Sequence, residues 1–328
     1  MTSTADPASL SPESLSYRPV AEDELAACAE VWRHGINDYI GRLGVPELPT
    51  DTGSLVRLYG HLRSTDPERF VAAVVPDVEA PGGERIVAFA SALLRERLWY
   101  LSMLFVMPEA QGAGVGRALL ARVAPPADAA TIRSTATDSA QPISNALYAS
   151  LGIVPRVPLL NLIGLPERPE VFGPLPGHVT PVPFERVAGS GGGDGHRRLA
   201  ETVDTIDREL LGVAHPLDHR YLRQEGRRGW LYTGPGGEAL GYGYASEAGR
   251  LGPVASRDDT LVAPILGHLT SAVTPRGAFA VWLPGTADRP VVATLQSGFR
   301  LDQFPVLLCW DRPFADLSRY IPISPGLL

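Results

Sequence analysis

The chain has 328 residues, 45% of them hydrophobic, and a formal net charge of −7. This length exceeds one ordinary compact core, so two domains of roughly 150 residues each are expected. The acidic balance argues against nucleic acid or an anionic membrane as the main partner. All 29 basic residues are arginines, which excludes chemistry that needs lysine, such as a Schiff base or a P-loop.

Targeting and redox features are few. Residues 1–16 are polar and lack the basic and apolar regions of a signal peptide, and no apolar run reaches the roughly 18 residues that span a bilayer. Cys28 and Cys309 belong to no CxxC pair, so neither a disulfide framework nor a cysteine zinc site is predicted. We therefore expect a soluble cytoplasmic protein, and the many Ala, Gly and Pro residues suggest a bacterium with a GC-rich genome.

Hydrophobic periodicity organises the first half of the chain. A disordered tail is predicted at 1–16. Helices are predicted at 21–39, 53–63, 112–124 and 143–151, and strands at 15–20, 70–75, 86–94, 98–106, 129–135 and 157–163. Short connections between the second, third and fourth of these strands predict an antiparallel meander.

The second half repeats this order of elements after a segment rich in Pro and Gly. That segment predicts a linker at 166–183, between a first domain at 17–165 and a second at 184–328. Helices are predicted at 196–211, 217–224, 260–273 and 290–297, and strands at 230–233, 239–246, 250–254, 278–283 and 304–310. The repetition suggests an ancient duplication.

A glycine-rich turn follows the predicted strand at 98–106 and opens the next helix. From Val106 it is Val-Met-Pro-Glu-Ala-Gln-Gly-Ala-Gly-Val-Gly-Arg. Alternate small residues let the backbone approach a ligand, and the N–H groups at a helix start favour an anion. A diphosphate site is the interpretation we favour over a turn without a ligand. The Rossmann fingerprint requires GxGxxG in a parallel unit, whereas this spacing is GxGxG after hairpins.

The pattern Val-x-Pro-x-x-Gln-Gly-x-Gly-Val-Gly resembles the pyrophosphate loop of the GNAT acetyltransferase superfamily, and the resemblance covers residues 15–165. It implies an α/β (α+β) fold of two GNAT-like domains, each a mixed, mostly antiparallel twisted sheet flanked by helices. The pyrophosphate of acetyl-CoA would then be held by the stretch Gln111, Gly112, Ala113, Gly114, Val115, Gly116 and Arg117. The strand end formed by Leu104, Phe105 and Val106 would pair with the pantetheine arm. The Leu104 amide would serve as an oxyanion donor.

Residues 144–153, Ser-Asn-Ala-Leu-Tyr-Ala-Ser-Leu-Gly-Ile, resemble the next motif of that family, with Ile153 where Phe is usual. Asn145 and Tyr148 are three residues apart and can share one helix face. The resemblance implies that Asn145 contacts the cofactor and that Tyr148 protonates the departing thiolate. The alternative is a half-buried tyrosine that only packs the helix on the sheet.

The sequence does not assign the general base that would deprotonate the acceptor amine, because the strand at 98–106 contains no acidic residue. Glu96, Asp138 and Asp38 are the nearby carboxylates, and no spacing argument assigns one of them as the general base. Water ordered by Tyr100 or Ser102 is the alternative.

Other polar clusters predict no site. His215 and His219 are four residues apart, but Pro216 argues against a regular helix there, so they are interpreted as loop or interface residues and no metal ligand is predicted. The acidic stripe farther upstream is interpreted as a solvated helix face: Glu201, Asp204 and Asp207.

The second half lacks the features of a coenzyme A site. Residues 252–260 have no glycine pair and carry Asp258 and Asp259, and Leu295 stands in place of the tyrosine. We interpret this half as a degenerate GNAT-like domain. The sequence thus predicts an N-acetyltransferase that acts on a primary amine, preferably a small cationic one, by direct attack in a ternary complex. It leaves open a homodimer, and an acetyl-CoA sensor without turnover is the alternative function.

Overall fold

A computed structural model describes residues 11–126, 130–189 and 193–328. The chain divides into two compact units. The first comprises Met1–Leu94 with Leu98–Arg133, and the second comprises Arg95–Arg97 with Ser134–Leu328. This division lies well before residue 165, where the sequence predicts the domain boundary. None of the helices in the described residues is both long and apolar enough to cross a membrane.

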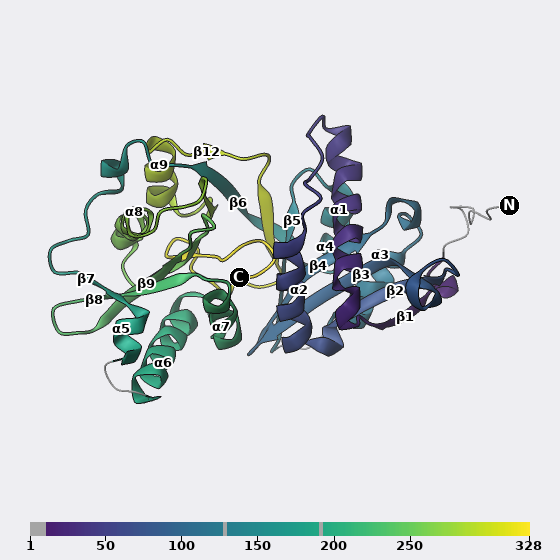
Figure 1. The fold of residues 1–328 in the computed structure, drawn as a ribbon, viewed down its shortest axis with the longest axis horizontal. Helices are drawn as coiled ribbons and strands as arrows, with labels where there is room; N and C mark the ends of the chain where they lie inside the picture. Colours follow the sequence, from purple (N-terminus) through teal and green to yellow (C-terminus); the bar gives the residue numbers. More distant parts are fainter. Residues whose placement is uncertain (1–10, 127–129, 190–192) are drawn as a thin grey trace. The chain divides into compact units, whose positions relative to one another are not determined.

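In the described residues, the first unit consists of strands β1 to β4 and helices α1 to α3 (Figure 1). Its strands lie in the order β1 (Ser16–Pro19), β2 (Phe70–Pro76), β3 (Glu84–Arg95) and β4 (Leu98–Val106), and its helices are α1 (Leu25–Arg42), α2 (Gly53–Thr65) and α3 (Val115–Val123). The pairs β1–β2 and β2–β3 are antiparallel. The tail predicted for 1–16 is too long, because Pro12–Ser14 form a 3-10 turn and β1 begins at Ser16; residues 1–10 lie outside the described residues.

Aromatic side chains fill the core of this unit. Tyr59 of α2 is fully buried, and its ring meets Phe70 and Phe89 edge-on at centroid distances of 5.7 and 5.4 Å. Burying one such side chain contributes about 2–3 kcal/mol. The Phe89 ring also packs against the Phe105 ring, with a centroid distance of 5.9 Å. The core therefore reaches the end of β4, where the candidate site begins.

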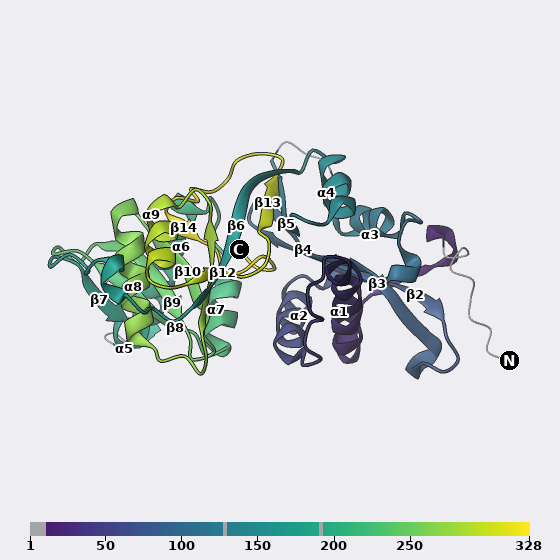
Figure 2. The same ribbon diagram turned by 90° about the horizontal axis from the view of Figure 1, so that it is seen from above.

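The second unit contains two sheets (Figures 1 and 2). One sheet has the order β5–β13–β6–β11, with β12 also on β6, and the other has the order β14–β10–β9–β8–β7. The strands are β5 (Ile132–Asp138), β6 (Val154–Gly164), β7 (Thr180–Pro183), β8 (Arg228–Thr233), β9 (Ala239–Ala245), β10 (Leu251–Ser256), β11 (Phe279–Pro284), β12 (Arg300–Leu301), β13 (Val306–Trp310) and β14 (Tyr320–Ile321). The helices are α4 (Pro142–Ala149), α5 (Phe184–Gly189), α6 (Gly193–Leu210), α7 (Pro216–Gln224), α8 (Val262–Ala272) and α9 (Asp288–Gln296).

Strand β13 comes from the end of the chain but lies between two strands of the first half. It is antiparallel to β5, with Val306 opposite Asp138, and to β6, with Val306 opposite Leu159. The long β6 then continues to β11, where Phe279 faces Gly164. The boundary at 165 is therefore wrong as a structural division, because strands from both sides of it alternate in one sheet.

The segment at 166–183 is not a plain linker, which corrects the sequence prediction. Phe172 and Val179 are buried in the hydrophobic core of the second unit. The segment ends in β7, whose residue Val182 pairs with Leu231 of β8. Pro and Gly produced the linker pattern, yet the apolar residues between them supply core contacts.

The two halves nevertheless share one order of elements. A four-stranded meander (β1–β4 and β7–β10) is followed by a helix (α3 and α8), a strand (β5 and β11) and a second helix (α4 and α9). This order supports the duplication inferred from the sequence.

Candidate functional site

The candidate site begins where β4 gives way to α3. A 3-10 turn, Pro108–Ala110, follows the strand, and Gly112 and Gly114 then take φ values of +80° and +89°. Gly114 is the N-cap of α3. Residues with a side chain rarely adopt this left-handed conformation, so the sequence permits the turn because both positions are glycine.

The first backbone N–H groups of this helix have no hydrogen-bond acceptor within the helix. The first helical bond runs from the Ala118 N–H to the Gly114 carbonyl at 3.0 Å. The N–H groups of Val115, Gly116 and Arg117 precede it and therefore have no helical acceptor. Residues 112–114 are exposed. Together with the helix dipole, these donors favour an anion with several oxygens.

The side chain of Gln111 secures the turn. Its Nε2 donates to the Val106 carbonyl at 3.0 Å, and so ties the loop to the end of β4. On the other side of that carbonyl, a Cβ added to Gly35 of α1 would lie 3.5 Å from the oxygen, so helix and strand approach closely here. The resemblance implies a backbone role for Gln111, and the structure adds this role for its side chain.

Replacing Gln111 by alanine is expected to remove that tie. The loss of one hydrogen bond destabilises the turn by about 1 kcal/mol, and we expect an affinity for acetyl-CoA about fivefold lower. Isothermal titration calorimetry measures the affinity, and thermal unfolding serves as the control for the fold. An unchanged affinity would show that the loop keeps its shape without the glutamine.

The end of β4 differs from its beginning in exposure. Residues 98–103 are buried, whereas Leu104, Phe105 and Val106 are half-buried. The Phe105 ring packs edge-on against Trp32 of α1 at 6.4 Å, so its side chain belongs to the core and only its backbone is suited to a ligand. The Met107 N–H donates to the Val87 carbonyl at 2.8 Å, which keeps this end on β3.

Asn145 and Tyr148 belong to the second unit, on α4. The Asn145 Nδ2 donates to the carbonyls of Asp138 and Gln141 at 3.0 and 2.7 Å and so closes the turn between β5 and α4. Its Oδ1 is buried and has no hydrogen-bond partner among the described residues. Asn145 therefore has a structural role that the sequence did not reveal, and its Oδ1 is not used in that role.

Tyr148 is buried. Burial raises the pKa of its phenol well above the usual value, and the negative charges available to Cys309 and Asp138 act in the same direction. A phenol in this environment stays protonated at neutral pH, which is the state required of a proton donor.

Asp138 stands apart from the other carboxylates considered as bases. It ends β5, and burial raises the pKa of its carboxyl to about 6. Glu96, by contrast, is ion-paired with Arg208 at 2.8 Å, and Asp38 is ion-paired with Arg42. On β4, Tyr100 and Ser102 are buried. A carboxyl with a pKa near neutrality suits a general base.

Two interpretations of polar residues are wrong. Pro216 occupies the first position of α7, where its missing N–H costs nothing, so a regular helix does carry His219. Asp207 is fully buried rather than solvated, because it bonds to His219 and Tyr242. Periodicity placed Asp207 on a helix face but could not show which partners cover that face.

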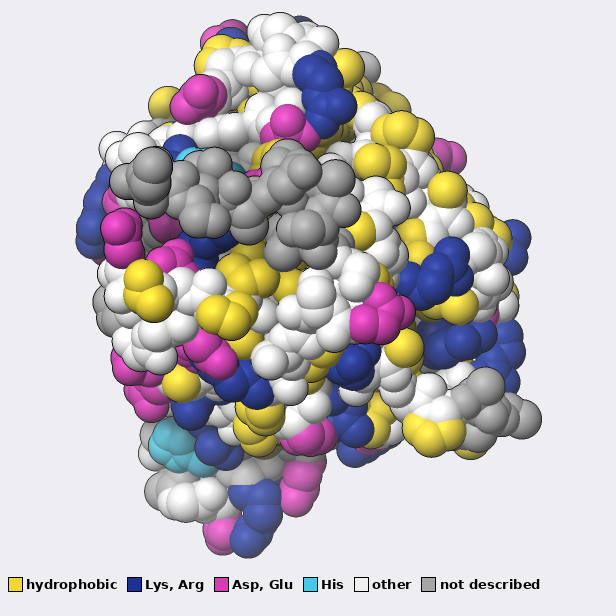
Figure 3. All heavy atoms as spheres, turned by 90° about the vertical axis from the view of Figure 1, so that its right-hand side faces the viewer, with side chains coloured by type: hydrophobic (Ala, Val, Ile, Leu, Met, Phe, Trp, Pro, Cys, Tyr) yellow, Lys and Arg dark blue, Asp and Glu magenta, His cyan; other side chains and the backbone are white. Residues whose placement is uncertain are grey.

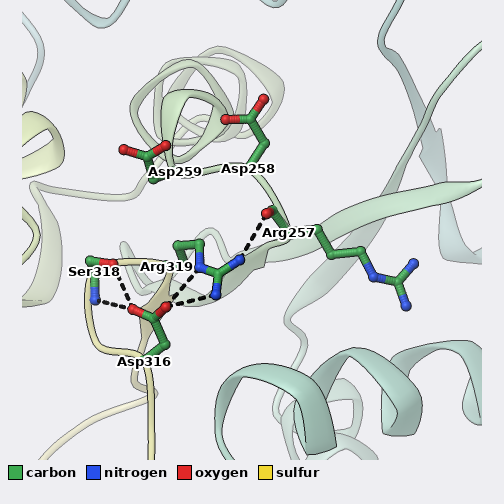
Figure 4. Close-up of a pocket in the computed structure, with 6 residues that line it drawn as sticks. All are labelled: Arg257, Asp258, Asp259, Asp316, Ser318 and Arg319. Atoms are coloured by element: carbon green, nitrogen blue, oxygen red, sulfur yellow. Dashed lines mark hydrogen bonds and ion pairs between the residues drawn. The ribbon is translucent and has the colours of Figure 1, made fainter.

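The corresponding helix start in the second half is closed. Asp258 accepts hydrogen bonds from the N–H and the hydroxyl of Thr260 at 2.8 and 2.7 Å. It lines an open surface pocket of about 590 Å³ together with Arg257, Asp259, Asp316, Ser318 and Arg319 (Figure 4). The two arginines are ion-paired with Glu209 and Asp316. A carboxylate thus occupies the place that a phosphate would need.

Charges of both signs face the solvent on the side of the protein in Figure 3, where magenta acidic side chains are interspersed with dark blue arginines. A uniformly basic face, which nucleic-acid binding favours, is not what this view shows.

An antiparallel sheet whose fourth strand ends in a glycine-lined helix start defines an acetyltransferase type of fold. Residues 78–158 match the family model of the acetyltransferase (GNAT) domain. In these residues the chain is similar to the GNAT acetyltransferases. No curated protein matches the sequence significantly.

Solved structures resemble the fold over nearly the whole chain. A putative acetyltransferase from Pyrococcus horikoshii has a TM-score of 0.71 at 13% identity, covering 96% of both chains. A GCN5-related N-acetyltransferase from Sphaerobacter thermophilus has a TM-score of 0.57 at 17% identity, covering 94% of this chain and 99% of that one. A tandem GNAT protein from the clavulanic acid biosynthesis pathway has a TM-score of 0.50 at 15% identity, covering 91% and 99%. At these identities the likeness shows the fold.

Proposed function

We propose that the protein is an N-acetyltransferase that moves an acetyl group from acetyl-CoA to a primary amine. The start of α3 carries the proposal, because Gly112 and Gly114 shape a turn whose following N–H groups lack helical acceptors. The diphosphate of coenzyme A fits such a row of donors. Bound acetyl-CoA would supply the acetyl group as a thioester.

Two residues of the second unit are proposed to handle protons. Tyr148 would hold a proton at its hydroxyl oxygen for the departing sulfur, since burial keeps the phenol protonated. Asp138 would accept the proton of the amine, directly or through water. Its pKa of about 6 leaves it ionised at neutral pH yet more basic than an ordinary aspartate. The acidic chain favours a small cationic amine as the acceptor.

The pH profile tests Asp138. Its pKa is raised from 3.8 to about 6, so the base is protonated and inactive below about pH 6 and active above it. We expect kcat/KM to rise through this range, and Asp138→Asn to remove the rise and lower the rate about tenfold. Asp38→Asn is the matched control and should keep the profile. A profile that Asp138→Asn leaves unchanged would contradict the assignment.

The same pKa has a stability consequence with a defined sign. The folded state binds the Asp138 proton more tightly than the unfolded state. Its contribution to stability is therefore present below about pH 4 and lost as the pH rises through about 6. As the pH rises from about 4 to about 6, we expect the melting temperature of the wild type to fall relative to that of Asp138→Asn.

The function itself is tested by calorimetry with acetyl-CoA and by thiol release with a panel of primary amines. Uptake of acetyl-CoA with amine-dependent thiol release supports the enzyme. Binding of acetyl-CoA without thiol release in the presence of any amine would favour the acetyl-CoA sensor. The sensor is the second candidate function because β4 contains no carboxylate. Failure to bind millimolar acetyl-CoA would refute both.

A further inference from the structure

Three side chains that can bind a metal meet inside the second unit. Asp207 of α6, His215 before α7 and His219 of α7 each have at most 3% of their surface exposed. One donor atom from each lies within 4.8 Å of the others. The Nε2 atoms of His219 and His215 lie 2.8 and 3.3 Å from the same oxygen, Asp207 Oδ2.

The outer atoms of two of these side chains, His219 and Asp207, have hydrogen-bond partners of their own. His219 Nδ1 is 3.0 Å from the Tyr244 hydroxyl, and Tyr242 donates to the other carboxylate oxygen, Asp207 Oδ1. His215 Nδ1 makes no hydrogen bond among the described residues. Metal-binding histidines and carboxylates are held in this way, with outer atoms bonded and inner atoms converging on one point.

The charges leave room for a cation. Asp218 is neutralised by buried Arg95 through two bonds of 2.8 Å. Asp207 contacts the two histidines and Tyr242. One turn earlier, Asp204 has a buried Oδ1 with no hydrogen-bond partner among the described residues. A divalent cation would offset these carboxylates while both imidazoles stay neutral.

We propose that Asp207, His215 and His219 bind a divalent transition-metal ion, Zn²⁺ being the ion that suits this donor set, and that it ties α6 to α7. Metal–ligand bonds of 2.0–2.1 Å in a tetrahedral site separate donor atoms by about 3.4 Å. The 3.3 Å separation already fits, and the 2.8 Å separation has to open by about 0.6 Å. The hydroxyl of Tyr320 lies 3.2 Å from His215 Nε2.

A proton is the competing occupant. A proton held on His215, between Asp207 and Asp218, would also supply a positive charge. The proton and the metal ion exclude each other, because both would bind to Nε2 of His215. Metal analysis of the full chain separates them. The protein is treated with chelator, exposed to Zn²⁺ or Co²⁺ both when folded and during refolding, and passed over a desalting column. We expect about one equivalent of metal per chain and the visible bands of tetrahedral Co²⁺.

Variants then locate the site. Asp207→Asn keeps the shape and the contact to Tyr242 but removes a charged ligand, and His219→Gln removes an imidazole. Each should weaken retention of Co²⁺ about tenfold or more. His268→Gln is the matched control, because His268 bonds to the Tyr232 hydroxyl at 2.9 Å outside the cluster, and it should retain the metal.

The inference is overturned if the wild-type chain retains less than about a tenth of an equivalent of either metal under both loading conditions. It is also overturned if Asp207→Asn and His268→Gln retain the metal equally. Where Asp207→Asn does not fold, His219→Gln is compared with His268→Gln in its place, and the visible bands of the wild type show whether the bound Co²⁺ is tetrahedral. None of these readouts depends on acetyl transfer.

Discussion

Replacing Gly112 by aspartate is expected to weaken acetyl-CoA binding about 100-fold. The new carboxylate would lie beside the donors proposed to hold the diphosphate, where a like charge costs several kcal/mol. No atom of the described residues lies within 4 Å of an added Cβ at this position, so the Cβ itself meets no neighbour. Calorimetry with acetyl-CoA measures the affinity.

Gly82 provides a matched control. It has a φ of +83°, it likewise has no atom within 4 Å of an added Cβ, and it lies in the turn before β3. Gly82→Asp therefore carries the same backbone strain, about 1–2 kcal/mol, without a carboxylate at α3. Equal losses of affinity in the two variants would mean that strain, and not a diphosphate at this loop, explains the effect.

Replacing Tyr148 by phenylalanine is expected to lower kcat about 100-fold while the affinity for acetyl-CoA changes less than about threefold. The change removes one hydroxyl and its proton but keeps the buried ring. Steady-state kinetics and calorimetry together give the two numbers. A sensor without turnover would keep its response in this variant, whereas an enzyme that needs the proton would not.

Tyr59→Phe is the control for that experiment. Its hydroxyl is buried and has no hydrogen-bond partner among the described residues, so its loss should leave kcat unchanged. An undiminished rate in Tyr148→Phe would leave the tyrosine as a packing residue, and water would have to protonate the sulfur.

Features that depend on nearby residues were predictable from the sequence. The β4–turn–α3 unit is contiguous, and its positive-φ glycines can be recognised because no other residue adopts that conformation easily. The meander follows from short turns. The GNAT fold was thus predicted correctly, whereas the cofactor-binding role of Gln111–Gly116 stays a prediction.

Contacts between distant residues were not predictable in this way. Asp207 and His219 belong to different helices, and periodicity shows neither which helices pack together nor that both side chains are buried. The raised pKa of Asp138 comes from burial, which its place at a strand end does not show.

The position of β13 also constrains how the protein is made. On the ribosome, β5 and β6 emerge long before Val306–Trp310, and in the finished sheet β13 alone bridges them. Until translation reaches that strand, both have exposed edges that can pair wrongly with other chains. A nascent chain stopped at residue 165 should therefore depend on chaperones, although it already contains every residue proposed to handle acetyl-CoA.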